Sequence, residues 1–169
     1  APDGLSVAGG APVDQEKARD LFTATDRATI DNDIIAGIPY IASRSDGNGK
    51  IGAVGFCYGG GMALRCAAER SEVNAAVCFY GSALKPEQIL NVKAPLMMHY
   101  AGKDERINAG IHDFRIALDA QGIAYSLHMY PGTQHGFHND SSTARYDVAA
   151  AKLAWARTIA LFDSALKTS

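Results

Sequence analysis

Five residues, Gly55-Phe-Cys-Tyr-Gly59, constrain the fold of this chain more than any other stretch. They follow the apolar run Ile51–Phe56 and precede Met62–Glu69, a run with helical composition. A strand, a tight turn and a helix around G-x-S-x-G form a nucleophile elbow, and here cysteine stands where serine is usual. A Cβ atom at either flanking glycine would crowd such a turn. We therefore predict a strained turn that presents a cysteine thiol at the start of a helix.

The thiol of Cys57 has two interpretations. The free N–H groups and the positive dipole end of the following helix would favour the thiolate, which is the form that a nucleophile needs. Alternatively, a cysteine in a glycine-rich turn serves only as a small buried hydrophobic residue. The pattern by itself leaves both interpretations open.

Two loops further along the chain favour the nucleophile. Pro95–Ala101 predicts a strand that ends shortly before Asp104, and Ile123–Tyr130 predicts another that ends shortly before His135. Singly, Asp104 fits a loop or helix-capping residue, and His135 fits a solvated loop residue. Together they lie past the carboxyl ends of strands, where α/β enzymes assemble their sites. The chain order nucleophile, acid, histidine is that of the α/β-hydrolases.

On these residues the chain resembles the dienelactone hydrolase family, cysteine-dependent enzymes of the α/β-hydrolase fold. The resemblance is carried by Gly52–Gly61, Val77–Gly81, Leu96–Asp104 and Tyr130–Phe137. It implies a catalytic triad of Cys57, Asp104 and His135, an acyl-thioester intermediate and no cofactor. The backbone N–H of Tyr58, the residue after the nucleophile, would be one donor of the oxyanion hole. The expected substrate is a small carboxylic ester or lactone.

Several parts of the family's domain have no counterpart here. The first strands, their crossover helix and the loop with the second oxyanion-hole donor are missing, and Ala1-Pro2-Asp3 resembles the end of a family strand. We expect residues 1–169 to form a single domain, the C-terminal portion of a longer hydrolase. The strand Ile51–Phe56 would then be a bare sheet edge, and such edges recruit partners. We predict that it pairs with a cleaved N-terminal fragment or with a second copy of itself.

The substrate is less well defined than the reaction. Family members that cleave dienelactones bind the substrate carboxylate through an arginine four residues after the catalytic histidine, a serine directly after it and an arginine in the early segment. The corresponding positions here are Asn139, Gly136 and, approximately, Val7. Arg145, in the same loop as the histidine, could approach the site instead. We therefore expect a general carboxylic ester or lactone rather than a dienelactone.

The remaining segments predict a mostly parallel sheet with helices on both faces. Strands at Ile51–Phe56, Ala75–Tyr80, Pro95–Ala101 and Ile123–Tyr130 alternate with helices, which is the α/β pattern. One amphipathic helix would pack its apolar positions on the sheet: Ile30, Ile34, Ile38 and Ile41. The last helix, over about residues 146–166, would do the same with Leu153, Ile159 or Ala160, and Phe162.

Composition excludes several other classes. A chain of 169 residues with 47% apolar residues and a formal net charge of −2 is neither disordered nor a nucleic-acid-binding surface. No apolar stretch reaches the ~20 residues of a membrane span. Three cysteines without framework spacing indicate reduced thiols and a cytoplasmic location.

Three alternatives differ from this interpretation. His135-Gly-Phe-His138 with Asp140 resembles a metal-ligand spacing, but no paired C-x-x-C accompanies it and no metal site is expected. A truncated hydrolase scaffold that acts by binding or dimerisation would keep the fold and differ in the reactivity of Cys57. A flavodoxin-like binding protein fits the strands but leaves Asp104 and His135 unexplained.

Overall fold

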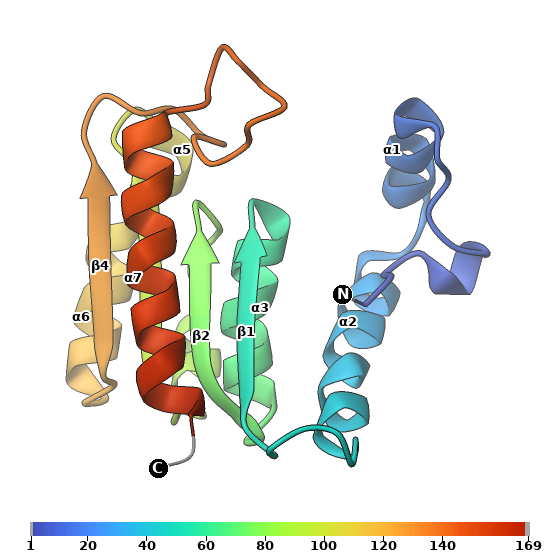
Figure 1. The fold of residues 1–169 in the computed structure, drawn as a ribbon, viewed down its shortest axis with the longest axis horizontal. Helices are drawn as coiled ribbons and strands as arrows, with labels where there is room; N and C mark the ends of the chain where they lie inside the picture. Colours follow the sequence, from blue (N-terminus) through green and yellow to red (C-terminus); the bar gives the residue numbers. More distant parts are fainter. Residues whose placement is uncertain (1, 168–169) are drawn as a thin grey trace.

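Between residues 2 and 167, the part of the chain that the computed structural model describes, four parallel strands form a sheet with helices on both faces (Figure 1). The elements are η1 (Ser6–Ala8), α1 (Gln15–Ala24), α2 (Arg27–Ala42), β1 (Ile51–Phe56), α3 (Tyr58–Glu69), β2 (Val73–Phe79), α4 (Pro86–Ile89), β3 (Leu96–Ala101), α5 (Glu105–Asn108), α6 (Ile111–Ala120), β4 (Tyr125–Tyr130) and α7 (Val148–Leu166). The strand order β1-β2-β3-β4 makes chain neighbours sheet neighbours. The predicted α/β class is confirmed.

Alternate residues of the central strands enter two cores. Met98 and Tyr100 of β3 join the core that α3 and α6 cover, whereas Met97 and Ala101 join the core beneath α7. Because successive side chains of a strand point to opposite faces, both faces of the sheet are buried. This explains why the central strands read as unbroken apolar runs.

The register of the strands brings three loops to one end of the sheet. Phe56, the last residue of β1, pairs with Phe79, the last residue of β2. Ala101 at the end of β3 pairs with Tyr130 at the end of β4. Parallel strands that end in register present their following loops side by side, which is the condition for a site built from several loops.

Helix α2 packs beside α3 and presents a somewhat different face from the predicted one. Ile30 and Ile38 are buried as expected, but Ile35 completes the buried face and Ile41 is 47% exposed. The N-caps of α1 and α2 are Asp14 and Asp26, whose side chains accept backbone N–H groups. The helix lies where the apolar spacing predicts it, and its buried face is rotated about the helix axis relative to the predicted face.

Helix α7 corrects the predicted orientation more strongly. Leu153 and Ile159 are exposed, and the residues that face the sheet are small: Ala150, Ala151, Ala154 and Thr158. Of the predicted contacts, Phe162 does pack against the core beneath this helix. Small side chains let the helix pack closely against the sheet. The face of α7 that packs on the sheet is therefore its face of small residues and not its face with the larger apolar side chains.

Strand β1 lies at an edge of the sheet, as predicted. Within residues 2–167 no strand pairs with its outer side, and Val54 and Phe56 are 39% and 38% exposed. Pro2 and Asp3 form no strand, and Ala1 lies outside the described residues. No helix in the described part of the chain is long and apolar enough to cross a bilayer.

A buried histidine joins β3 to α7. The hydroxyl of Thr158 donates to a backbone carbonyl and so accepts from Nε2 of His99 at 3.2 Å, while Tyr130 donates to Nδ1 of His99 at 2.9 Å. The ring is fully buried. Burial, reinforced by His128 and Arg157, lowers the pKa of His99 to about 3. His99 is therefore held as the neutral imidazole.

This histidine predicts a loss of stability in mild acid. Unfolding restores a pKa near 6.5, so below that pH the unfolded chain binds a proton that the folded chain excludes. The free energy of unfolding should fall as pH decreases from about 6.5 toward 3, with a slope approaching about 1.4 kcal/mol per pH unit. Urea titrations at several pH values would measure this slope.

His99→Gln is the test variant and His112→Gln, at an exposed position on α6, is its control. His128 and His138 also have lowered pKa values through burial, so the informative quantity is the difference in slope between the two variants. Equal slopes in both variants would contradict this account of His99.

Candidate active site

Cys57 occupies a strained turn between β1 and α3. Its backbone has φ 53° and ψ −121°, a conformation that a residue with a Cβ rarely adopts. Its N–H donates to the carbonyl of Phe79 at 3.0 Å, and its own carbonyl accepts from Gly60 at 3.0 Å. The side chain is exposed at the carboxyl end of the sheet. The geometry is that of the predicted elbow.

One of the two glycines in the motif is required by space and the other is not. A Cβ on Gly55 would lie 1.8 Å from the carbonyl oxygen of Gly59, whereas a Cβ on Gly59 would meet nothing within 4 Å. The prediction that both glycines relieve crowding was therefore wrong for Gly59. The second tight position is Gly60, where a Cβ would lie 2.7 Å from the carbonyl oxygen of Phe79.

Asp104 both caps a helix and faces the histidine. It is the N-cap of α5, with the N–H of Ile107 3.4 Å from Oδ1, and its side chain is buried. Asn108, at the end of the same helix, donates to the carbonyl of Ala101 at 2.8 Å and so ties α5 to β3. The other carboxylate oxygen, Oδ2, is free to accept from the loop after β4. The two interpretations of Asp104 are thus compatible.

His135 links the acid to the thiol. Its Nδ1 lies 2.5 Å from Oδ2 of Asp104, and its Nε2 lies 3.1 Å from Sγ of Cys57. The loop that carries it is anchored to β3's loop, since Lys103 N–H donates to the carbonyl of Thr133 at 2.9 Å. The structure brings the three predicted residues together in the predicted sequence of contacts.

The electrostatics of the thiol differ from the expectation. Although the side chain is exposed, partial desolvation of its sulfur raises the pKa of Cys57 above its ordinary value; the charge of Asp104 adds to this, while Arg145 and Arg106 oppose it. The helix N-terminus was expected to favour the thiolate, whereas the net shift of the pKa is toward the thiol, with desolvation as its largest cause. A raised pKa favours the protonated thiol, and Nε2 of His135, 3.1 Å from Sγ, is the base within reach.

Two cavities open at Cys57, and their linings include residues that sequence reasoning did not place. A cavity of 240 Å³ is lined by Cys57, Tyr58, Tyr80, Ser82, Arg106, Ile107 and His135. Another, of 290 Å³, is lined by Phe56, Cys57, Tyr80, Gly136, His138, Asn139, Asp140 and Arg145. Arg145 thus approaches the site, which its position in the histidine loop had only suggested. Arg106 and Tyr80 follow strands β3 and β2, a placement that could have identified them.

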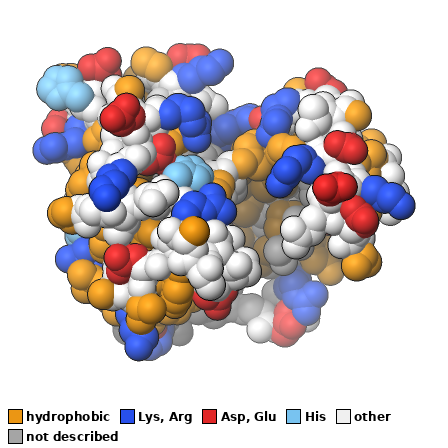
Figure 2. Space-filling model, turned by 90° about the horizontal axis from the view of Figure 1, so that it is seen from above, with side chains coloured by type: hydrophobic (Ala, Val, Ile, Leu, Met, Phe, Trp, Pro, Cys, Tyr) orange, Lys and Arg blue, Asp and Glu red, His pale blue; other side chains and the backbone are white. Residues whose placement is uncertain are grey.

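A larger cavity lies beside these, between α2 and α3. Its volume is 770 Å³, and it shares Tyr58 and Ser82 with the smaller cavity at Cys57. Figure 2, which views the molecule of Figure 1 from above, shows Lys and Arg side chains around a hollow. Three cations line the cavity: Arg27, Arg65 and Lys85.

Within residues 2–167, no cluster of three or more His, Cys, Asp or Glu side chains is arranged to hold a metal ion. His138 contacts aromatic rings instead, with its ring centroid 5.3 Å from that of Phe56 and 5.7 Å from that of Trp155. His138 is therefore an aromatic wall of the site in this structure.

Comparisons of this chain with a family model and with individual proteins point to the same family. A model of the dienelactone hydrolase family matches residues 6–166. Carboxymethylenebutenolidase 1 of Cupriavidus pinatubonensis is 30% identical over 159 residues, 93% of this chain and 67% of that protein. Carboxymethylenebutenolidase of Pseudomonas putida is 32% identical over 142 residues, 83% of this chain and 59% of that protein.

Other relatives show how much of each protein the similarity covers. A protein of Saccharolobus solfataricus is 37% identical over 126 residues, 74% of this chain and 48% of that protein. The chain therefore spans about half to two thirds of the length of these relatives. The crystal structure of dienelactone hydrolase from Anabaena variabilis has a TM-score of 0.70 and 26% identity, covering 97% of this chain and 76% of the other.

The two glycines of the elbow predict opposite responses to the same substitution. Gly55→Ala should lower the free energy of unfolding by about 3 kcal/mol or more, or prevent folding, because its Cβ would overlap backbone atoms. Gly59→Ala should be neutral or stabilise by up to about 1 kcal/mol, because alanine is the better helix former and the space is open. Chemical denaturation measures both, and equal effects would contradict the elbow geometry.

Proposed function

The chain belongs to the dienelactone hydrolase family, and we propose that it carries the catalytic triad of a hydrolase acting on carboxylic esters or lactones. The observation that supports this most directly is the continuous contact from Cys57 through His135 to Asp104. Nucleophile, base and orienting acid within hydrogen-bond reach are the arrangement that acyl transfer needs. The relatives named carboxymethylenebutenolidase support the same reaction class.

In the proposed mechanism the thiol loses its proton as it attacks. Nε2 of His135 accepts the proton from Cys57 while the sulfur bonds to the substrate carbonyl carbon, and the carbonyl oxygen becomes an oxyanion. The backbone N–H of Tyr58 is the proposed donor to that oxyanion. The ester or lactone C–O bond then breaks, and the leaving oxygen takes the proton from His135. An acyl-thioester on Cys57 results.

The second half of the reaction reverses the roles. His135 removes a proton from water, the hydroxide attacks the thioester carbonyl, and the carboxylic acid leaves as the sulfur regains a proton. Asp104 stabilises the imidazolium that forms in each half. Because the pKa of Cys57 is raised, the thiol form is favoured, and attack on the carbonyl needs a base that accepts its proton.

The extent of the chain limits its expected rate. We infer that residues 1–169 form one domain, and the chain spans about half to two thirds of the length of these relatives. Tyr58 supplies one oxyanion-hole donor, and loss of a second donor typically costs ~10²–10³ in rate. The chain by itself should acylate slowly.

The cytoplasmic location stays a prediction, and the three cysteines are free thiols.

His135 and Cys57 are the residues on which activity should depend. Cys57→Ala should abolish the burst of p-nitrophenolate from p-nitrophenyl acetate, and His135→Ala should slow it by ~10²–10⁴ through loss of the general base. His112→Ala, an exposed histidine on α6, is the matched control and should leave the burst unchanged. A burst in His135→Ala at the wild-type rate would favour the scaffold that acts by binding or dimerisation.

We also infer that the edge of β1 is paired in the working protein, with an N-terminal fragment or with a second copy. The unpaired edge and the exposed Val54 and Phe56 support this, since bare apolar edges pair readily. Val54→Lys should weaken the association at least ~10-fold, whereas Leu90→Lys, at an exposed apolar position on another surface, should not.

Sedimentation velocity of the purified chain, with denaturing intact mass to reveal any second polypeptide, is the measurement. A wild-type chain that sediments as a lone monomer at all concentrations would contradict the pairing. Equal association of the two lysine variants would place the partner elsewhere.

A further inference from the structure

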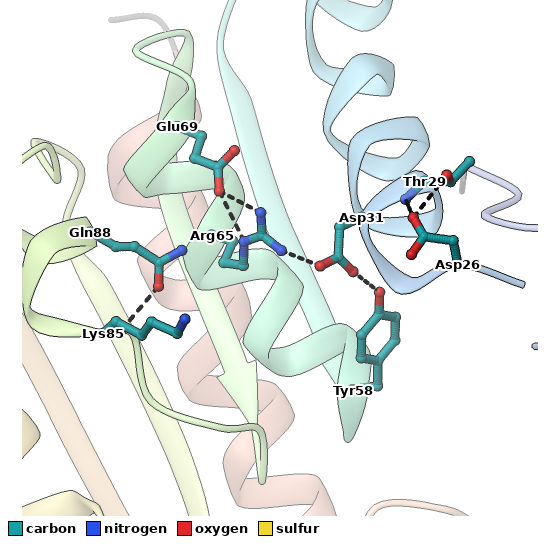
Figure 3. Close-up of polar contacts among 8 residues, drawn as sticks. All are labelled: Asp26, Thr29, Asp31, Tyr58, Arg65, Glu69, Lys85 and Gln88. Atoms are coloured by element: carbon teal, nitrogen blue, oxygen red, sulfur yellow. Dashed lines mark hydrogen bonds and ion pairs between the residues drawn. The ribbon is translucent and has the colours of Figure 1, made fainter. Parts of the chain in front are cut away.

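The hydroxyl of Tyr58 contacts Asp31, and Asp31 in turn contacts Arg65 (Figure 3). The hydroxyl donates to one carboxylate oxygen of Asp31 in α2, and Arg65 in α3 donates to the other oxygen. Arg65 also forms an ion pair with Glu69 at 2.7 Å. Asp31 is 9% exposed, and its two oxygens are both satisfied, as a buried carboxylate requires. We call this group of Asp31, Tyr58 and Arg65 the Tyr58 clamp.

The ring of Tyr58 is held as well. It forms a T-shaped pair with Phe22 of α1, with ring centroids 5.3 Å apart. The guanidinium of Arg27 lies 4.6 Å from the Tyr58 centroid and 4.2 Å from the Phe22 centroid. Contacts from α1 and α2 therefore fix both ends of a side chain that belongs to the first residue of α3.

The sequence around Tyr58 gives this clamp its importance. The next three residues are glycines, Gly59-Gly-Gly61, so the first turn of α3 has no other side chain that could anchor it. Glycine is among the weakest helix formers, because its backbone has more freedom to lose. Cys57, on the other side, is held in a strained conformation. The carbonyl of the peptide between Cys57 and Tyr58 accepts from the N–H of Gly60 at 3.0 Å, and the contacts of the Tyr58 side chain are the second restraint on the orientation of this peptide.

We propose that Asp31 is a positioning residue for the oxyanion-hole donor: by holding the Tyr58 hydroxyl, it fixes the backbone N–H of Tyr58 beside Cys57. The inference rests on the proposed function and adds a residue that the triad does not include. Asp31 lines neither of the two cavities that open at Cys57. Asp31 lies 27 residues before Tyr58 in the sequence. It contacts the side chain of Tyr58, and the backbone N–H of that same residue is the proposed oxyanion-hole donor. A displacement of about 1 Å at a reacting group can cost ~10² in rate.

Two reagents separate positioning from general damage. p-Nitrophenyl acetate acylates Cys57 through an oxyanion, whereas iodoacetamide alkylates the same sulfur by displacement and forms no oxyanion. Cys66 and Cys78 are buried, so Cys57 is the exposed thiol among the three. Asp31→Ala should lower the acylation rate about 10- to 100-fold while alkylation stays within about two-fold of wild type.

Conservative and control variants sharpen the comparison. Asp31→Asn keeps an oxygen that accepts from the Tyr58 hydroxyl and should retain most of the acylation rate. Asp33→Ala, two residues away on the same helix, should change neither rate. Tyr58→Phe removes only the hydroxyl and should reproduce Asp31→Ala, and the double variant should be no slower than either single one. Tyr58→Phe also serves if Asp31→Ala does not fold.

The outcomes are distinguishable. Acylation of Asp31→Ala and Tyr58→Phe at the wild-type rate would overturn the inference and leave the proposed function intact. An equal loss of acylation and alkylation would also overturn it, because the clamp would then support the fold and not the donor. A wild-type chain that alkylates but never acylates would overturn both the inference and the proposed function.

Discussion

The close contact between the backbones of Gly55 and Gly59 is the constraint on which the site depends. With no side chain at Gly55, the start of α3 folds back against the end of β1. That approach forces Cys57 into its strained conformation and turns its thiol outward. Local strain of this kind persists only where the surrounding structure overdetermines it. Here the hydrogen bond from Cys57 to Phe79 ties the turn to the neighbouring strand.

The parallel sheet then does the rest of the assembly. Because the strand ends are in register, the loops after β3 and β4 lie next to each other, and Asp104 and His135 meet without any long insertion. The helix cap that Asp104 forms on α5 leaves its second oxygen for the histidine. Asp104 thus caps a helix and also belongs to the series of contacts that leads through His135 to the thiol. The sequence could exclude neither role for Asp104, because the residue fills both.

Sequence reasoning reached the strands, the edge position of β1 and the three residues that meet, because glycine spacing and apolar runs are local signals. It failed where the outcome is a balance between distant groups. The pKa of Cys57 depends on burial and on charges from Arg145 and Arg106, which only the fold brings near. The rotation of α7 depends on how closely alanines approach the sheet, and the contact of Asp31 with Tyr58 joins residues that share no motif.

The central claim is that Cys57 forms a covalent acyl-thioester, and the mass of the protein during turnover tests it most directly. The chain would be mixed with p-nitrophenyl acetate, quenched in acid within the burst, and analysed intact and after proteolysis. The account predicts a species heavier by one acetyl group, with the acetyl on the peptide that contains Cys57, and its absence in Cys57→Ala. Ester hydrolysis without any acetylated protein, or acetyl groups spread over surface lysines, would contradict the account.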